Sequence, residues 1–151
     1  MIRPSLSVRK TGEDDARLLF DWVNSVDSLA GKAETSAPIN WETHVEWLLR
    51  RLSDPDTHMF IAEVDGRPVG QVRLQRKAEA FEIDVFIVSD ERRRGYAAQA
   101  LTKTLQETFD RATVVDAVVK EGNRASEALF KSLGFRQIDR SDGLRRFQIV
   151  V

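Results

Sequence analysis

The sequence predicts an α/β (α+β) fold of about seven strands and four helices. Short β-branched and aromatic runs alternate with segments of helical periodicity, in the order β, α, α, β, β, β, α, β, α, β, β. Asp65-Gly66 separates two of the runs in the pattern typical of a tight hairpin turn. With 151 residues, 42% of them hydrophobic, the chain is long enough for one sizeable core. We therefore expect residues 1–151 to form a single domain.

The first third of the chain predicts a strand, two helices and a long loop. The strand is expected over residues 5–9, and a helix begins at Glu13. Residues 25–39 are small, polar and interrupted by Gly and Pro, which predicts a loop that faces a substrate. Asn40 caps the second helix, and its apolar stripe is expected to comprise Trp41, Val45, Leu48, Leu49 and Leu52.

His44 and Trp47 lie off that stripe, by about 80° and about 140° at 100° per residue. They are neighbours at i and i+3 of the same helix. One interpretation makes them the wall of a substrate pocket, in which His44 has a pKa suited to a catalytic base. The other makes them a rim pair that packs under the preceding loop.

The rest of the chain predicts a central strand just after Phe81, five further strands and two helices. Residues 75–80 are expected to form a turn, and residues 83–88 a buried strand. The helix that follows ends near Asp110, and the last helix runs from Asn123 to Leu133 with Ala125, Ala128, Leu129 and Leu133 facing the core. The remaining strands are expected at residues 59–64, 67–74, 114–119, 135–138 and 146–151.

The stretch from Phe81 to Leu105 joins a strand to a helix through a basic, glycine-containing turn. The first turn of a helix leaves backbone N–H groups unpaired, and the helix dipole adds partial positive charge there. Arg92, Arg93 and Arg94 add full charges, so the turn predicts an anion site.

Composition excludes several classes of protein. The net charge of −1 gives no general attraction to nucleic acid. No cysteine is present, and the two histidines are far apart in the chain, so no metal site is expected. No apolar stretch approaches the roughly 20 residues that span a bilayer, and we expect a cytoplasmic protein without membrane contact.

Two motifs in the right order resemble those of the GNAT superfamily of N-acetyltransferases. Arg92-x-x-Gly95-x-Ala97 resembles its pyrophosphate-binding signature. The stretch Asn123-x-x-Ser126-x-x-Leu129-Phe130-x-x-Leu133-Gly134-Phe135 resembles its last helix. The resemblance covers essentially the whole chain and implies the GNAT fold, a mixed central sheet of about seven strands flanked by four helices. It also implies acetyl-CoA as acetyl donor.

The resemblance implies where the cofactor binds. Backbone N–H groups from Arg92 through Tyr96 to Ala97 are expected to hold the pyrophosphate. Main-chain groups of Val85, Phe86 and Ile87 are expected to pair with the pantetheine arm. The flank of the last helix that faces the groove is expected to comprise Asn123, Ser126 and Phe130.

Phe130 departs from the superfamily, many of whose members carry a tyrosine there as general acid. The single tyrosine, Tyr96, lies in the phosphate turn instead. The thiolate then leaves unprotonated, or water or Ser126 supplies the proton, or the domain binds CoA without turnover.

Three residues are candidates for the base that takes the proton of the amine: Glu82, Asp84 and His44. Superfamily members often carry a glutamate near the position of Glu82. The alternative for Glu82 and Asp84 is pairing with Arg73 or Arg76 across the hairpin.

The first half of the chain resembles superfamily members that act on nucleotide-linked amino sugars, as in pseudaminic-acid-type biosynthesis. This implies a small-molecule amine acceptor, with Trp22 and Trp47 as stacking surfaces. Competing interpretations are an N-terminal acetyltransferase of the ribosomal-protein kind, which acetylates a peptide amine, and a CoA-binding module without catalysis. A monomer or homodimer is expected in each case. The resemblance rests on Trp22-x-Asn24, Trp41-x-x-His44-x-x-Trp47 and Asp65-Gly66-x-Pro68-Val69-Gly70-Gln71-x-Arg73.

Overall fold

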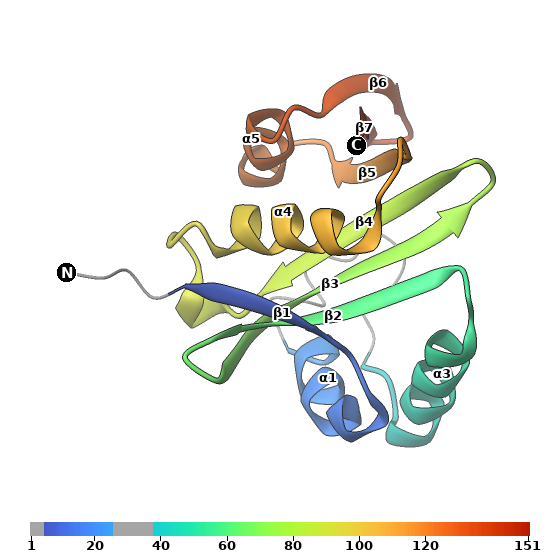
Figure 1. The fold of residues 1–151 in the computed structure, drawn as a ribbon, viewed down its shortest axis with the longest axis vertical. Coiled ribbons are helices and arrows are strands. Elements are labelled where there is room, and N and C mark those ends of the chain that lie inside the picture. Colours follow the sequence, from blue (N-terminus) through green and yellow to red (C-terminus); the bar gives the residue numbers. More distant parts are fainter. Residues whose placement is uncertain (1–4, 26–37) are drawn as a thin grey trace.

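A computed structural model describes residues 5–25 and 38–151 and contains one seven-stranded sheet (Figure 1). Every neighbouring pair of strands is antiparallel except β4 and β5, which are parallel, so the sheet is mixed as expected. In sheet order the strands are β1 (Leu6–Lys10), β2 (Thr57–Val64), β3 (Arg67–Lys77), β4 (Ala80–Ile87), β5 (Val114–Lys120), β7 (Leu144–Val150) and β6 (Arg136–Ser141).

The described residues form four α-helices, two on each face of the sheet (Figure 1). They are α1 (Ala16–Val23), α3 (Trp41–Ser53), α4 (Tyr96–Thr108) and α5 (Arg124–Ser132). Successive residues of a strand point to opposite faces, and β2 therefore supplies two cores. Ala62 and Val64 belong to the large core under α4 and α5, whereas Met59 and Ile61 pack against α1 and α3. None of the described helices is long and apolar enough to cross a membrane.

The buried face of α3 differs from the predicted stripe. His44 and Leu48 are buried, whereas Trp41 and Leu49 are 41% and 40% exposed. The apolar side chains do share one side of the helix, but the buried face is rotated from that side towards His44. Packing against α1 and β2 selects the face that His44 and Leu48 occupy.

The turn before β4 is much shorter than the predicted turn over residues 75–80. Strands β3 and β4 pair through Lys77 and Ala80, which leaves only residues 78–79 in the turn. Residues 75–80 lack an apolar alternation, but cross-strand pairing extends both strands into them. One consequence is that Lys77 lies next to Glu82. The predicted loop at residues 25–39 lies, but for its ends, outside the described residues.

An ion pair fastens β1 to the first helical turn that follows it. Arg9 donates to both oxygens of Asp15 at 2.8 Å, and the same carboxylate accepts the Gly12 N–H at 2.9 Å. Asp15 is 8% exposed. The hydrogen bond from Arg9, opposed in part by burial, holds the pKa of Asp15 below its ordinary value.

We predict that Asp15→Asn lowers the free energy of unfolding by about 1.5–3 kcal/mol at neutral pH, the range for hydrogen bonds to charged groups. Because the pKa is lowered in the folded state, the carboxylate stabilises the fold above its ordinary pKa. That stabilisation disappears as the pH falls through the lowered pKa. Urea unfolding at neutral pH and at about pH 3 should therefore show a smaller difference between variant and wild type in acid. Asp14→Asn, at an exposed neighbour, is the control and should change neither value.

Candidate active site

Strands β4 and β5 are paired at one end only. Their ladder comprises two rungs, Phe81 with Val115 and Glu82 with Asp116. Beyond these two pairs, no residue of β4 pairs with a residue of β5, although β4 continues to Ile87 and β5 to Lys120. A gap in the ladder of the sheet therefore opens towards the carboxyl ends of both strands, where ligands bind in open α/β sheets.

The main-chain groups that face this opening belong to Val85 and Ile87. The Val88 N–H donates to the Val69 carbonyl of β3 at 2.9 Å. Because backbone groups of successive residues point to alternate sides, Phe86 also directs its groups to β3. Gly70 supports this: a Cβ there would lie 2.1 Å from the Phe86 carbonyl oxygen. Phe86 was expected to offer its main-chain groups to the pantetheine arm. They point instead to β3, which lies close against β4 at this residue.

The turn between β4 and α4 forms a backbone cradle. Arg93 and Gly95 both have positive φ, 64° and 78°, and Gly95 is the N-cap of α4. Within the described residues, the backbone N–H groups of residues 93–98 have no protein acceptor. Successive N–H groups in a turn with left-handed residues form a concave anion site, which the helix dipole strengthens.

The three arginines of the turn have different partners. Arg92 donates from Nε to the Ile87 carbonyl oxygen at 2.9 Å, which ties the end of β4 to the turn. Arg94 pairs with Glu91, which also binds Arg67 through both carboxylate oxygens. The Arg67 guanidinium holds the pKa of Glu91 below its ordinary value. Arg93 is exposed. The side chains of Arg92 and Arg94 therefore hold the turn in place, and their positive charges lie beside the N–H cradle.

Helix α5 brings the C-terminal motif to the other side of the opening. Asn123 is its N-cap and accepts the Ser126 N–H at 3.2 Å, so the capping role is present. Phe130 is 4% exposed and contacts the ring of Phe135 at 5.1 Å between centroids. The core-facing stripe differs from expectation, because Ala125 and Ala128 are exposed while Phe130 and an ion-paired Glu127 are buried. Phe130 thus packs in the core, and its ring carries no hydroxyl that could donate a proton.

Glu82 and Asp84 project from β4 on the face opposite α4. Glu82 is 27% exposed and accepts from Lys77 Nζ at 3.2 Å. Asp84 lies 3.7 Å from Arg73 and is 64% exposed. The expected pairing of Asp84 with Arg73 is therefore confirmed, whereas Arg76 pairs with Asp56.

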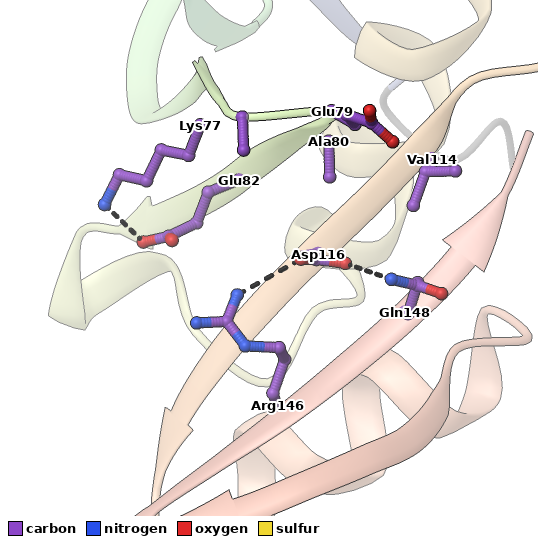
Figure 2. Close-up of a pocket in the computed structure, with 9 residues that line it drawn as sticks. Lys77, Glu79, Ala80, Glu82, Val114, Asp116, Arg146 and Gln148 are labelled. Carbon is purple, nitrogen blue, oxygen red and sulfur yellow. Dashed lines mark hydrogen bonds and ion pairs between the residues drawn. The ribbon is translucent and has the colours of Figure 1, made fainter.

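A cavity of about 570 Å³ lies where β4 and β5 meet, and Glu82 lines it (Figure 2). The sequence does not predict the five other polar residues of this cavity: Lys77, Glu79, Asp116, Arg146 and Gln148. Asp116 is 9% exposed and accepts from both Arg146 and Gln148. A lone carboxylate inside the apolar run of β5 was the available signal for it. No sequence signal connects Arg146 and Gln148 to Glu82, because the antiparallel return of β7 brings them there.

His44 is a buried residue between α3 and α1. It is 2% exposed, and its Nε2 lies 3.0 Å from the Ala16 carbonyl oxygen. Its ring contacts those of Phe20, Trp41 and Trp47 at centroid distances of 5.5, 6.2 and 6.0 Å. This placement favours the packing interpretation over a base.

We predict that His44→Ala lowers the free energy of unfolding by about 2–4 kcal/mol, because it removes a buried ring and a hydrogen bond. Acetyl transfer by the folded protein should fall less than tenfold, with an unchanged pH profile. Chemical denaturation and steady-state rates measured on the same preparation separate the two effects. A larger loss of kcat with a shifted pH profile would restore His44 as the base.

The cradle and the opening together fit a long ligand with a pyrophosphate in its middle. Unpaired N–H groups of residues 93–98 suit phosphate oxygens. The main-chain groups of Val85 and the N–H of Ile87, whose carbonyl oxygen accepts from Arg92, suit an amide-containing arm that adds to the strand edge. The open space around Gly95, where a Cβ would meet no atom within 4 Å, leaves the approach to the cradle unobstructed. These residues therefore fit acetyl-CoA.

Comparison with known proteins supports this geometry. The family model described as "Acetyltransferase (GNAT) family" matches residues 23–135. No curated protein matches the sequence. The structure of an acetyltransferase from Thermus thermophilus matches with 24% identity and a TM-score of 0.80, over 97% of each chain. A Brucella melitensis ribosomal-protein-alanine N-acetyltransferase matches with 24% identity and a TM-score of 0.80, over 96% of this chain and 99% of the other.

A third similar structure contains the coenzyme. It is a Vibrio cholerae spermidine N-acetyltransferase in complex with CoA and spermine, with 16% identity and a TM-score of 0.83, over 96% of this chain and 95% of the other. At these identities the three structures establish the fold. The family match spans well over half of the chain. The chain therefore belongs to the acetyltransferase (GNAT) family, whose members take the acetyl group from acetyl-CoA.

Proposed function

We propose that residues 1–151 form one catalytic domain that transfers the acetyl group of acetyl-CoA directly to a primary amine. The observation that carries this proposal is the junction of three features. These are the two-rung ladder of β4 and β5, the N–H cradle that follows β4, and the cavity containing Glu82. The first two suit the coenzyme, and the third suits the acceptor.

In this proposal the unpaired N–H groups of residues 93–97 hold the pyrophosphate, whereas the Arg92 N–H donates to the Ser89 carbonyl oxygen at 3.4 Å. The edge of β4 at Val85 and Ile87 holds the pantetheine arm. Asn123 and Ser126 of α5 close the opposite side of the groove, whereas Phe130 is buried against Phe135. Bound acetyl-CoA supplies a thioester carbonyl that an amine can attack. An N–H group of the β4 edge faces the carbonyl oxygen and stabilises the charge that develops on it.

Glu82 is the proposed base. It lies in the last rung before β4 and β5 separate, on the face left open by α4. The attacking amine must be neutral, and Glu82 takes the proton of the acceptor's ammonium group directly or through water. The new bond joins the amine nitrogen to the acetyl carbon as the carbon–sulfur bond breaks. A thiol pKa near about 8.5 allows the thiolate to leave without an acid, consistent with Phe130.

The acceptor proposed is a small-molecule amine on a nucleotide-linked sugar. Trp22 and Trp47 flank the open face of β3 and β4, where Trp22 contacts Phe86 and Trp47 contacts Arg73. Half-buried indole rings beside a guanidinium suit a flat sugar or base. Two similar structures suggest alternative acceptors, because one is a ribosomal-protein-alanine N-acetyltransferase and the other a spermidine N-acetyltransferase. These alternatives are a ribosomal-protein N-terminus and a polyamine.

An acceptor screen tests the function. The protein is mixed with acetyl-CoA and, separately, a UDP-linked amino sugar, an N-terminal peptide, spermidine and free amines, and released thiol is measured. We expect thiol release with at least one acceptor and acetylated product by mass spectrometry. Binding of acetyl-CoA without thiol release from any amine would instead indicate a CoA-binding module.

A further inference from the structure

We propose that Arg146 binds an anionic group of the acceptor, so that the substrate is a primary amine that also carries a carboxylate or phosphate. This inference rests on the proposed function and names the chemistry of its acceptor. It comes from the cavity beside Glu82, whose residues provide both signs of charge.

The cavity is lined by side chains of both charge signs. Three carboxylates line it: those of Glu82 and Asp116, which are register partners on β4 and β5, and that of Glu79 in the turn before β4. Lys77 and Arg146 bring two cations to the same cavity from β3 and β7 (Figure 2). A volume of about 570 Å³ is within the range of small-molecule sites, which is about 300–1,000 Å³. Such a lining suits a ligand that is itself both cation and anion.

Asp116 and Gln148 hold the Arg146 guanidinium in place. Arg146 Nη1 donates to one oxygen of Asp116 at 3.1 Å, and Gln148 Nε2 donates to the other oxygen at 2.8 Å. The Asp116 side chain is 12% exposed, whereas that of Arg146 is 41% exposed. Among the described residues, this is the one side-chain hydrogen bond that Arg146 makes. A guanidinium has five N–H donors in a rigid fork, so donors remain for a carboxylate or phosphate.

An acceptor with both charges can replace the ion pair of Lys77 with Glu82. The two side chains are 56% and 27% exposed, and such exposed pairs contribute little to stability. When the acceptor's ammonium binds Glu82, Lys77 loses its partner, and an anionic group on the same acceptor gives Lys77 a new one. A singly cationic acceptor offers no such exchange, so selection for the doubly charged acceptor follows.

Matched acceptor pairs test the proposal. Each pair differs only in its anion: an α-amino acid with its primary amide, and an amino-sugar phosphate with the neutral amino sugar. We expect wild-type kcat/KM to favour the anionic member of at least one pair by about tenfold or more, as for other charge-assisted contacts. The pair that shows the preference identifies carboxylate or phosphate as the anion.

Variants assign the preference to Arg146. Arg146→Gln should remove the preference by raising KM about tenfold more for the anionic member than for the neutral member, and Arg146→Lys should restore part of the preference. Arg140→Gln removes the same charge from the same hairpin, at an exposed residue outside the cavity, and should keep the preference. Equal use of both members by the wild type, or an equal loss for both in Arg146→Gln, would overturn the proposal.

A binding measurement separates this proposal from the proposed function. The side-chain Nε–H signal of Arg146 is followed by NMR during titration with the preferred anionic acceptor and with its neutral counterpart, without acetyl-CoA. A shift with the anionic compound alone supports the proposal. The Arg146 proposal would be refuted if thiol were released only with singly cationic amines and no anionic acceptor shifted the Arg146 signal. The acetyltransferase function would still stand.

Discussion

Glu82→Gln is expected to lower kcat for acetyl transfer by about 100-fold or more at neutral pH, the range for removal of a general base. Gln keeps the size of the side chain but cannot accept a proton from the acceptor. Glu82 is part of the last rung between β4 and β5 and lines the cavity, so it is within reach of an amine that approaches the opening. The rate should recover as the pH approaches the pKa of the acceptor's amine, about 8 for an α-amino group.

Asp84→Asn is the matched control for Glu82→Gln. Asp84 lies two residues further along the same face of β4, is 64% exposed and pairs with Arg73. We expect its kcat to stay within about threefold of the wild type, since an exposed pair of this kind contributes little. If Asp84→Asn instead reproduced the loss and the pH dependence while Glu82→Gln did not, the base would be Asp84.

Gly95→Val is expected to weaken acetyl-CoA binding by about tenfold to 100-fold, which corresponds to losing one or two hydrogen bonds to charged phosphate oxygens. Gly95 has a φ of 78°, a conformation that costs other residues about 1–2 kcal/mol. A β-branched side chain relieves that strain by rotating the backbone, which redirects the N–H groups of the cradle. Isothermal titration with acetyl-CoA measures the affinity directly, and the acceptor KM should change little.

Gly66→Val separates strain from function. Gly66 also has a φ of 78° with no atom within 4 Å of a Cβ, but it lies in the hairpin turn between β2 and β3. Both variants should lose a similar amount of unfolding free energy, about 1–2 kcal/mol. Only Gly95→Val should lose affinity for acetyl-CoA. An equal loss of affinity in both would show that the cradle is not the phosphate site.

The order of strands and helices could be predicted from the sequence, because each element depends on the local pattern of apolar residues. The strand and helix periodicities around Arg92-x-x-Gly95-x-Ala97, and the Asp65-Gly66 turn, predicted all seven strands of the sheet. The cradle could also be predicted, because a strand, a glycine and a helix in succession determine where backbone N–H groups point. Boundaries were less predictable, as in the two-residue turn at residues 78–79, where cross-strand pairing outweighed the polar sequence.

The local sequence pattern could not predict which helical side chains are buried and what they contact. His44 and Trp47 were assigned to a flank of α3, but α1 and β2 pack against that flank and bury His44. Phe130 was placed on a cofactor-facing flank, whereas it packs against Phe135. The apolar periodicity of each helix gives an approximate direction for its buried face, and packing against the neighbouring elements sets the final one.

The order of the elements and the position of the turn with unpaired N–H groups are encoded locally, because both follow from interactions between residues close together in the chain. Which charged residues share the cavity with Glu82 depends instead on the folded sheet. Lys77 comes from β3, Asp116 from β5 and Arg146 from β7. Lys77 reaches Glu82 through the local hairpin, but the pairing of strands distant in the sequence brings Asp116 and Arg146 there, and no local pattern encodes that register.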